Sequence, residues 1–325
     1  MKRRDFIAIF GGAAVAWPLV AEAQRSGSPA RIGLLSPGSA FTASYVVEAF
    51  RAGLRDLGYV EGKDVVLEFR FGEGDPDRLP DLARELLALD VDVIVTNGPG
   101  TLAARQVTST TPIVMAVMGD AVGTGVIASL ARPGGNITGS TFFYPDLMAK
   151  RLQMLKEVIP SLSRAGVLQF PGYAPNVPSL SAMEAAAKTL GIELHSFDAR
   201  GPDDFESAFG AMADSRIGGI VFSDHPLLLR EMNMLVAMAL AQRLPSIGAL
   251  ELTAAGGLMA YGVDFRELYR RAAYFVDRIL KGAKPADLPA EQPTKLHMAV
   301  NLGAAKALGL IIPQSILIRA DEVIE

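Results

Sequence analysis

Short apolar runs alternate along the chain with segments that place apolar residues every three or four positions. A short run without polar alternation is typical of a strand buried on both faces of a parallel sheet, and the wider spacing is typical of an amphipathic helix. The runs predict strands over residues 31–35, 65–70, 91–96, 112–117 and 137–141, and again over 165–169, 192–197, 218–222 and 245–250. This alternation predicts an α/β fold with parallel sheets covered by helices.

One stretch, residues 111–140, marks the division between two such lobes. Its apolar run ends at Gly119 and Asp120, a helix is expected from about Gly125 to Ala131, and a strong turn at 133–136 follows. Because ligands of open parallel sheets bind at the carboxyl ends of the strands, we expect a ligand cleft between the lobes. The predicted division is residues 31–140 plus about 259–300 for lobe 1, and residues 141–258 plus about 301–325 for lobe 2.

Composition narrows the classes of protein. A length of 325 residues fits about two domains of ordinary size, and a chain that is 50% hydrophobic and 20% charged is expected to fold. The formal net charge of -4 offers no basic surface for nucleic acid. The absence of cysteine from the sequence excludes disulfides, thiolate metal sites and cysteine nucleophiles.

The first residues resemble an export signal. Lys2, Arg3 and Arg4 precede the apolar stretch 7–20, and an Ala-x-Ala cleavage pattern ends at Ala23. The apolar stretch is shorter than the roughly 20 residues that span a bilayer, although a retained anchor is the alternative. The paired arginines are similar to a twin-arginine signal, with general secretion as the other route. We therefore expect residues 1–23 to be a signal peptide and the mature protein to be periplasmic.

An enzyme is the competing interpretation. Residues 123–128 fit the G-x-G-x-x-A form of a dinucleotide-binding fingerprint after a strand. That fingerprint requires an acidic residue at the end of the next strand, whereas the strand ending at Thr141 is followed by Phe142, Phe143 and Tyr144. The three histidines are far apart in sequence and no nucleophile elbow or zinc motif occurs. We predict no catalytic residues, no metal site and no cofactor.

Several motifs resemble those of one family. The sequence SLARPGGNITG at 129–139 closely resembles a signature of ABC-transporter substrate-binding proteins, a family that includes tryptophan and tyrosine carriers. The similarity continues through residues 53–63, 150–152, 256–259, 280–289 and 301–325, which together cover essentially the whole mature chain. The chain differs from the family pattern at Ala121 and at residues 170–173, beside the expected ligand.

The resemblance implies a fold and a role. The fold is the type I periplasmic-binding-protein fold, in which two Rossmann-like lobes with parallel sheets are joined by a hinge that the chain crosses several times. The role is a monomeric binding protein that closes on a small amino-acid-like or carboxylate ligand and delivers it to an ABC permease in the inner membrane. A ligand sensor that acts on a membrane receptor is the alternative, and the sequence does not separate the two.

The loops at the carboxyl ends of the predicted strands supply the candidate ligand-binding residues. Those of lobe 1 are Ser36, Ser39, Asn97, Gly98, Thr101, Gly119 and Asp120, and those of lobe 2 and the hinge are Tyr173, Asn176, Asp224 and Tyr261. Helix N-termini in these loops suit a carboxylate, and Asp120 or Asp224 suits an ammonium. The alternative is that Asp120 and Asp224 cap helices and that Ser36, Asn97 and Gly98 form turns.

Overall fold

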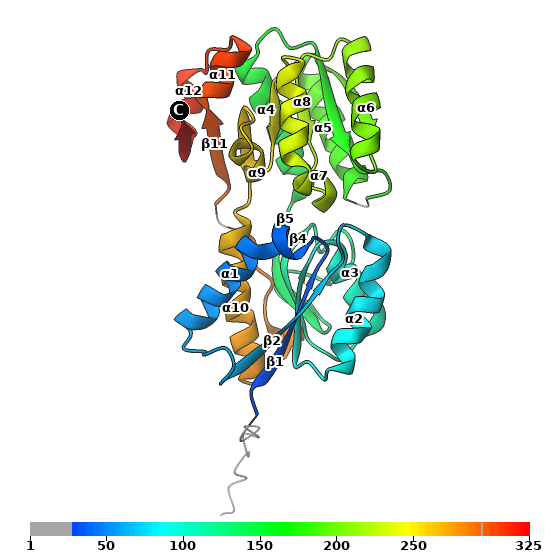
Figure 1. The fold of residues 1–325 in the computed structure, drawn as a ribbon, viewed down its shortest axis with the longest axis vertical. Coiled ribbons are helices and arrows are strands. Elements are labelled where there is room, and N and C mark those ends of the chain that lie inside the picture. The colour runs from blue at the N-terminus through cyan, green and yellow to red at the C-terminus, as the bar shows by residue number, and fades with distance from the viewer. Residues whose placement is uncertain (1–27, 174, 294) are drawn as a thin grey trace, which may run out of the picture.

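The chain folds into two α/β lobes, one above the other, in a computed structural model that describes residues 28–173, 175–293 and 295–325 (Figure 1). The expected signal peptide, residues 1–23, lies outside the described residues. Strands and helices alternate as the sequence pattern predicts, and the predicted two-lobed architecture with mainly parallel sheets is confirmed.

The first lobe is a sheet of strand order β2-β1-β3-β4-β5 with parallel pairing throughout the described strands. Its strands are β1 (Ala30–Ser36), β2 (Val65–Phe71), β3 (Val93–Asn97), β4 (Ile113–Gly119) and β5 (Ile137–Phe142). Its helices are α1 (Ala40–Asp56), the short η1 (Pro76–Arg78), α2 (Leu79–Ala88), α3 (Pro99–Val107) and α10 (Phe265–Leu280). Helices α1 and α10 pack together on one face, and α2 and α3 pack together on the other (Figure 1).

The second lobe is a sheet of strand order β12-β11-β10-β9-β8-β6-β7, parallel apart from the antiparallel pair β10–β11. Its strands are β6 (Arg164–Gln169), β7 (Glu193–Asp198), β8 (Ile220–Phe222), β9 (Ser246–Gly248), β10 (Met259–Gly262), β11 (His297–Asn301) and β12 (Glu322–Ile324). Its helices are α4 (Tyr144–Val158), α5 (Asn176–Leu190), α6 (Pro202–Asp214), α7 (Pro226–Arg230), α8 (Met232–Ala241), α9 (Leu250–Ala254), α11 (Leu302–Leu308) and α12 (Gln314–Arg319).

The sheets are buried on both faces, which explains the uninterrupted apolar runs. In β3, Val93 and Val95 join the core under α1 and α10, whereas Ile94 joins the core under α2 and α3. Successive side chains of a strand point to opposite faces, so a strand covered on both sides must be apolar at every position.

The chain passes between the lobes after β5 at residues 142–144, at 262–265 between β10 and α10, and again between 291 and 297. Before the last passage, η2 (Pro285–Asp287) and the residues after it run along β5, where the Thr138 hydroxyl donates to the carbonyl of Leu288 (2.8 Å). These passages form the hinge.

Three sequence predictions are wrong in detail. Strands β10 and β11, predicted for lobe 1, pair in the sheet of lobe 2, because their partners are β9 and β12. The helix expected from about Gly125 to Ala131 does not form; residues 121–130 make successive turns, with Gly125 at φ 67°. The strong turn at 133–136 leads back into β5 of the same lobe, so the crossing comes after Phe142.

Candidate functional site

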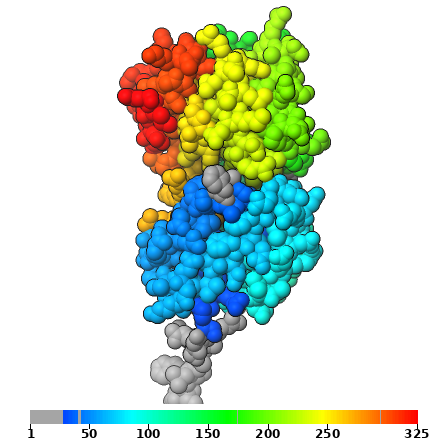
Figure 2. All heavy atoms as spheres, in the orientation of Figure 1, coloured from blue at the N-terminus to red at the C-terminus, as the bar shows by residue number. Residues whose placement is uncertain are grey.

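The two lobes are in direct contact along what we call the interlobe seam (Figure 2). The hydroxyl of Tyr45 in α1 donates to Glu251 Oε1 in α9 at 2.8 Å. Farther along the seam, Arg230 in α7 donates to the carbonyl oxygen of Glu73 at 3.0 Å. These contacts bring the carboxyl ends of strands from both sheets toward each other, which is the edge where open parallel sheets bind ligands.

The lobe 1 side of the seam is the β3–α3 junction. Asn97 ends β3, Gly98 caps α3 with a positive φ of 41°, and Thr101 lies in the first turn of α3 with its side chain fully buried. Gly98 tolerates this backbone conformation because it has no Cβ. Among the described residues, Asn97 Oδ1 and Thr101 Oγ1 are buried without a hydrogen-bond partner. Buried polar atoms are nearly always paired, so two orphaned oxygens at one strand–helix junction indicate a place for a ligand atom or a water.

Facing this junction is the β6–α5 loop of lobe 2. The Tyr173 hydroxyl lies 3.8 Å from the position that a Cβ on Gly98 would occupy. The ring of His225 stacks on Phe170 (4.1 Å between centroids) and meets the edge of Tyr173 (4.9 Å). His225 Nδ1 accepts a hydrogen bond from Leu227 N–H, which places the proton of the neutral ring on Nε2. Burial lowers the pKa of His225 to about 4, so the ring is neutral at physiological pH.

The end of β8 supplies two polar side chains. Ser223 Oγ is buried without a partner, as are the two oxygens of the β3–α3 junction. The next residue, Asp224, accepts two hydrogen bonds, of 2.6 and 3.0 Å, from Arg151 of α4. The pair neutralises both buried charges, which is the condition under which charged groups are tolerated in a protein interior.

Burial shifts the pKa values of side chains that meet across the seam. Desolvation raises the pKa of Glu251, and the hydrogen bond from Tyr45 opposes that rise in part. Desolvation also raises the pKa of the Tyr173 phenol, with the Asp224 carboxylate as a second cause. The seam therefore offers buried hydrogen-bonding groups around one compensated ion pair.

Most predicted residues of lobe 1 other than the β3–α3 junction serve local turns. Ser36 Oγ accepts from the Gly38 amide, and the Ser39 carbonyl accepts from the Ala43 amide in α1. Asp120 has a φ of 46° and its Oδ1 accepts from the Gly123 amide at 2.9 Å, so the alternative role of a local cap describes its present contacts. Gly119 packs against Tyr144, whose Cβ would lie 3.3 Å from a Cβ on this glycine.

Two predicted residues of lobe 2 also have structural contacts. The Asn176 amide donates to the carbonyl of Phe170 at 2.8 Å and so fixes the loop that carries Tyr173. Tyr261 contributes its backbone carbonyl, which accepts from Arg151 Nε at 2.7 Å. Asn97, Gly98, Thr101, Tyr173 and Asp224 are thus the predicted residues that the seam brings into one region.

Sequence reasoning missed several seam residues, among them Tyr45, Tyr144, Arg151, Ser223 and Glu251. The Tyr144 hydroxyl accepts a hydrogen bond from the Asp224 amide at 2.7 Å, which anchors the end of β8 to α4. Arg151 alone carried a readable signal. It lies three residues after Met148 and four before Leu155, on the apolar face of its helix, where a charged residue requires a buried partner.

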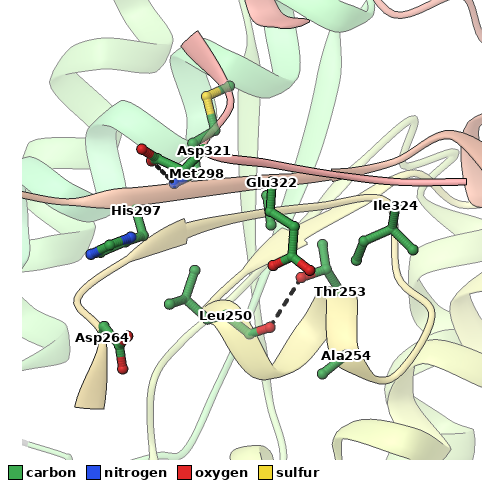
Figure 3. Close-up of a pocket in the computed structure, with 10 residues that line it drawn as sticks. Leu250, Thr253, Ala254, Asp264, His297, Met298, Asp321, Glu322 and Ile324 are labelled. Carbon is green, nitrogen blue, oxygen red and sulfur yellow. Dashed lines mark hydrogen bonds between the residues drawn. The ribbon is translucent and has the colours of Figure 1, made fainter. Parts of the chain in front are cut away.

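A separate cavity of about 190 Å³ lies on the side of the second lobe, between α9, β11 and β12. Figure 3 shows Asp264, His297 and Glu322 among its lining side chains. His297 Nε2 has no hydrogen-bond partner there, although Glu267 Oε2 lies 3.5 Å away. The cavity is smaller than the roughly 300–1,000 Å³ of typical ligand pockets, and none of the predicted site residues lines it.

The structure also bears on the enzyme alternative, whereas the retained anchor considered for residues 7–20 lies outside the described residues. The fingerprint at 123–128 lacks the helix whose N-terminus would hold a pyrophosphate, because these residues form turns. Among residues 28–325 as described, every helix falls short of the length or apolar character that a membrane span requires.

Comparison with known proteins gives consistent matches. The family model for ABC transporter substrate binding proteins matches residues 39–324. A tyrosine-binding protein of Clostridioides difficile is 22% identical over 265 residues, covering 81% of this chain and 76% of that protein.

Solved structures match over nearly the whole chain. An ABC domain from Streptococcus pneumoniae in complex with L-Trp is 25% identical with a TM-score of 0.84, and a conserved domain protein from Vibrio cholerae is 26% identical with a TM-score of 0.85. Each match covers 91% of this chain and 100% of the other. The predicted two-lobed α/β fold class is confirmed by these structures.

Proposed function

Because the chain belongs to the family of ABC transporter substrate-binding proteins, we propose that it is the exported binding component of an ABC importer, with an amino-acid-like or other carboxylate ligand held between its lobes. The family match also confirms the resemblance seen in the sequence motifs. Binding and release, without chemistry on the ligand, are the proposed activity.

The observation that supports this proposal is the set of orphaned polar atoms at the seam. Asn97 Oδ1 and Thr101 Oγ1 come from lobe 1 and Ser223 Oγ comes from lobe 2, and each is buried without a partner in the part of the chain that the structure describes. Leaving a buried polar group unpaired costs about 1–3 kcal/mol. A ligand that pairs with groups of both lobes recovers this energy only when the lobes are together.

The same groups favour a zwitterionic ligand. The N-terminal end of α3 carries the positive end of the helix dipole, which suits a carboxylate. Within the described residues, the Asp224 side chain accepts two hydrogen bonds, both from Arg151, so it retains acceptor positions for an ammonium. Tyr173 and His225 offer ring surfaces to a side chain. The tyrosine and tryptophan ligands in the names of the related proteins fit the same description.

Hinge closure is the proposed mechanism. The passages at 142–144, 262–265 and 291–297 permit the lobes to part, and a ligand that contacts both lobes binds the closed state more tightly than the open one. Ligand therefore shifts the population toward the closed state, which the permease in the inner membrane then recognises. The basic and apolar character of residues 1–23 supports export to the periplasm, where we propose that the protein acts as a monomer.

A thermal-unfolding screen tests the proposal. The purified protein, refolded to remove any carried ligand, is heated with L-tryptophan, L-tyrosine, aliphatic amino acids, small carboxylates or NAD. A ligand at a hundred times its dissociation constant adds about 2.7 kcal/mol to the free energy of unfolding, which raises the melting temperature by several degrees. A rise with amino acids or carboxylates supports the proposal. A rise with NAD alone, or with none of these compounds, contradicts it.

A further inference from the structure

Arg151 is a charged side chain with no exposed surface. It projects from the buried face of α4 and is 0% exposed, and the side chain of its partner Asp224 is only 7% exposed. Arginine is almost never fully buried unless it is paired. The interior of lobe 2 therefore holds an ion pair that hydrophobic residues of similar volume would replace at little cost to stability, so its presence calls for another reason.

The hydrogen bonds of Arg151 fix a geometry as well as a charge. Nη1 and Nη2 donate to the two oxygens of Asp224, at 2.6 and 3.0 Å, in the forked arrangement that only a guanidinium provides. Nε donates to the carbonyl of Tyr261 at 2.7 Å, and Nη1 also donates to the carbonyl of Phe222 at 3.3 Å. Four donor contacts to two segments, the end of β8 and β10, leave the guanidinium no freedom to turn toward a ligand.

Asp224 is held from a second side as well. Its backbone N–H donates to the Tyr144 hydroxyl at 2.7 Å. An ionised carboxylate has about four acceptor positions, and Arg151 occupies two of them. Asp224 stands at the end of β8 on the sheet edge that faces lobe 1, beside the orphaned Ser223 hydroxyl.

We infer that Arg151 is a positioning residue for ligand recognition. Its two hydrogen bonds to Asp224 orient the carboxylate so that the remaining lone pairs point to the seam, where they accept hydrogen bonds from the ammonium group of an amino-acid ligand. This inference rests on the proposed function and identifies the ammonium group as the part of the ligand that Asp224 binds. Arg151 itself does not touch the ligand. It sets the orientation of Asp224 and places a fixed positive charge beside that carboxylate.

The same guanidinium joins the site to the hinge. Tyr261, whose carbonyl it holds, lies in β10 directly before the passage at 262–265, and Arg151 itself follows the passage at 142–144 in α4. Arg151 therefore connects Asp224 to residues beside two of the three passages.

The test compares ligands with and without the ammonium group. Affinities of L-tyrosine and 3-(4-hydroxyphenyl)propanoate, and of L-tryptophan and indole-3-propanoate, are measured by calorimetry on the wild-type protein and on Arg151→Lys. Lysine keeps the charge and loses the fork. We expect the amine-bearing ligands to bind at least about tenfold more weakly, as for loss of a well-aligned hydrogen bond to a charged group, and the deaminated ligands to change less than about twofold.

Two further variants keep the result interpretable. Arg164→Lys alters an exposed pair, with Glu193 3.0 Å from Arg164 Nε, and should change neither affinity. The double variant Arg151→Met with Asp224→Leu removes both charges while filling the same space, so it should fold and bind the ligands of each pair about equally. Equal weakening of both ligand classes in Arg151→Lys, or a retained preference for the amine in the double variant, overturns the inference. A wild-type protein that binds both members of each pair equally well overturns the inference and leaves the proposed function standing. A wild-type protein that binds neither these ligands nor any amino acid or carboxylate of the unfolding screen overturns the proposed function.

Discussion

Replacing Tyr45 by phenylalanine removes the hydroxyl that joins the two lobes and changes little else. That hydroxyl donates to Glu251 Oε1 at 2.8 Å, from α1 of lobe 1 to α9 of lobe 2. The aromatic ring stays in place, including its contact with the guanidinium of Arg266, which lies 5.4 Å from the ring centroid. The variant therefore isolates one interlobe hydrogen bond.

The size of the effect follows from where the bond lies. In the closed arrangement desolvation raises the pKa of both partners, so neither group can replace the lost bond with bulk water. A buried partner left unpaired costs about 1–3 kcal/mol, whereas both groups are hydrated when the lobes separate. A loss of about 1–2 kcal/mol from the closed state alone lowers ligand affinity roughly 5- to 30-fold.

The assay is calorimetric titration of the wild-type protein and Tyr45→Phe with the ligand that the unfolding screen identifies. Tyr59→Phe is the matched control, because the Tyr59 hydroxyl donates to Asp277 Oδ1 at 3.0 Å entirely within lobe 1. Tyr59→Phe should lower the free energy of unfolding and leave affinity unchanged. The reasoning is refuted if Tyr45→Phe weakens binding no more than Tyr59→Phe does.

Three further predictions concern the seam and the first sheet. Thr101→Val removes an orphaned buried hydroxyl, so it should raise the melting temperature of the ligand-free protein slightly and weaken binding about tenfold; the same direction of change in both would contradict it. Because burial raises the pKa of Glu251, closure of the lobes favours binding of a proton by this carboxyl group. The contribution of that proton to the stability of the closed state is fully present below the ordinary carboxyl pKa and is lost as pH rises through the raised pKa. Affinity should fall with rising pH in that window, and Glu251→Gln, which still accepts from Tyr45, should abolish the slope; a slope that persists in titrations of this variant would exclude Glu251 as its source. Gly139 has a φ of 134°, and a Cβ there would lie 2.1 Å from the Met115 carbonyl oxygen. Chemical denaturation of Gly139→Ala should therefore show a free energy of unfolding lower by about 3 kcal/mol or more. Gly135 has open space around it, so Gly135→Ala should lower the free energy of unfolding by less than about 1 kcal/mol.

The alternation of strands and helices was predictable because burial on both faces leaves a local signature. Val93, Ile94 and Val95 are all apolar since the strand has a core on each side. Partner choice leaves no such signature. The apolar run at 259–262 reads the same whether it pairs with β9 or with a strand of lobe 1, so its lobe was assigned wrongly. The expected helix at 125–131 does not form because Gly125, with its positive φ, and the turn at 133–136 leave too short a segment between them.

The candidate site was predictable where it depends on strand ends. Asn97, Gly98 and Thr101 follow β3 in the sequence, so the rule for parallel sheets finds them. Arg151 and Asp224 are 73 positions apart, and no pattern within α4 predicts which carboxylate pairs with Arg151. Tyr45 and Glu251 are 206 positions apart and meet only because the lobes do. Contacts of this kind are set by tertiary structure, which a pattern along the chain does not encode.

The central claim is that ligand binds between the lobes and contacts both. A crystal structure of the refolded protein with the amino acid or carboxylate that most raises its melting temperature tests this directly. The account predicts the ligand at the interlobe seam, with its carboxylate near Thr101 in the first turn of α3, its ammonium on Asp224 and its side chain beside Tyr173. A ligand held by one lobe alone, or seated in the cavity between α9, β11 and β12, would contradict it.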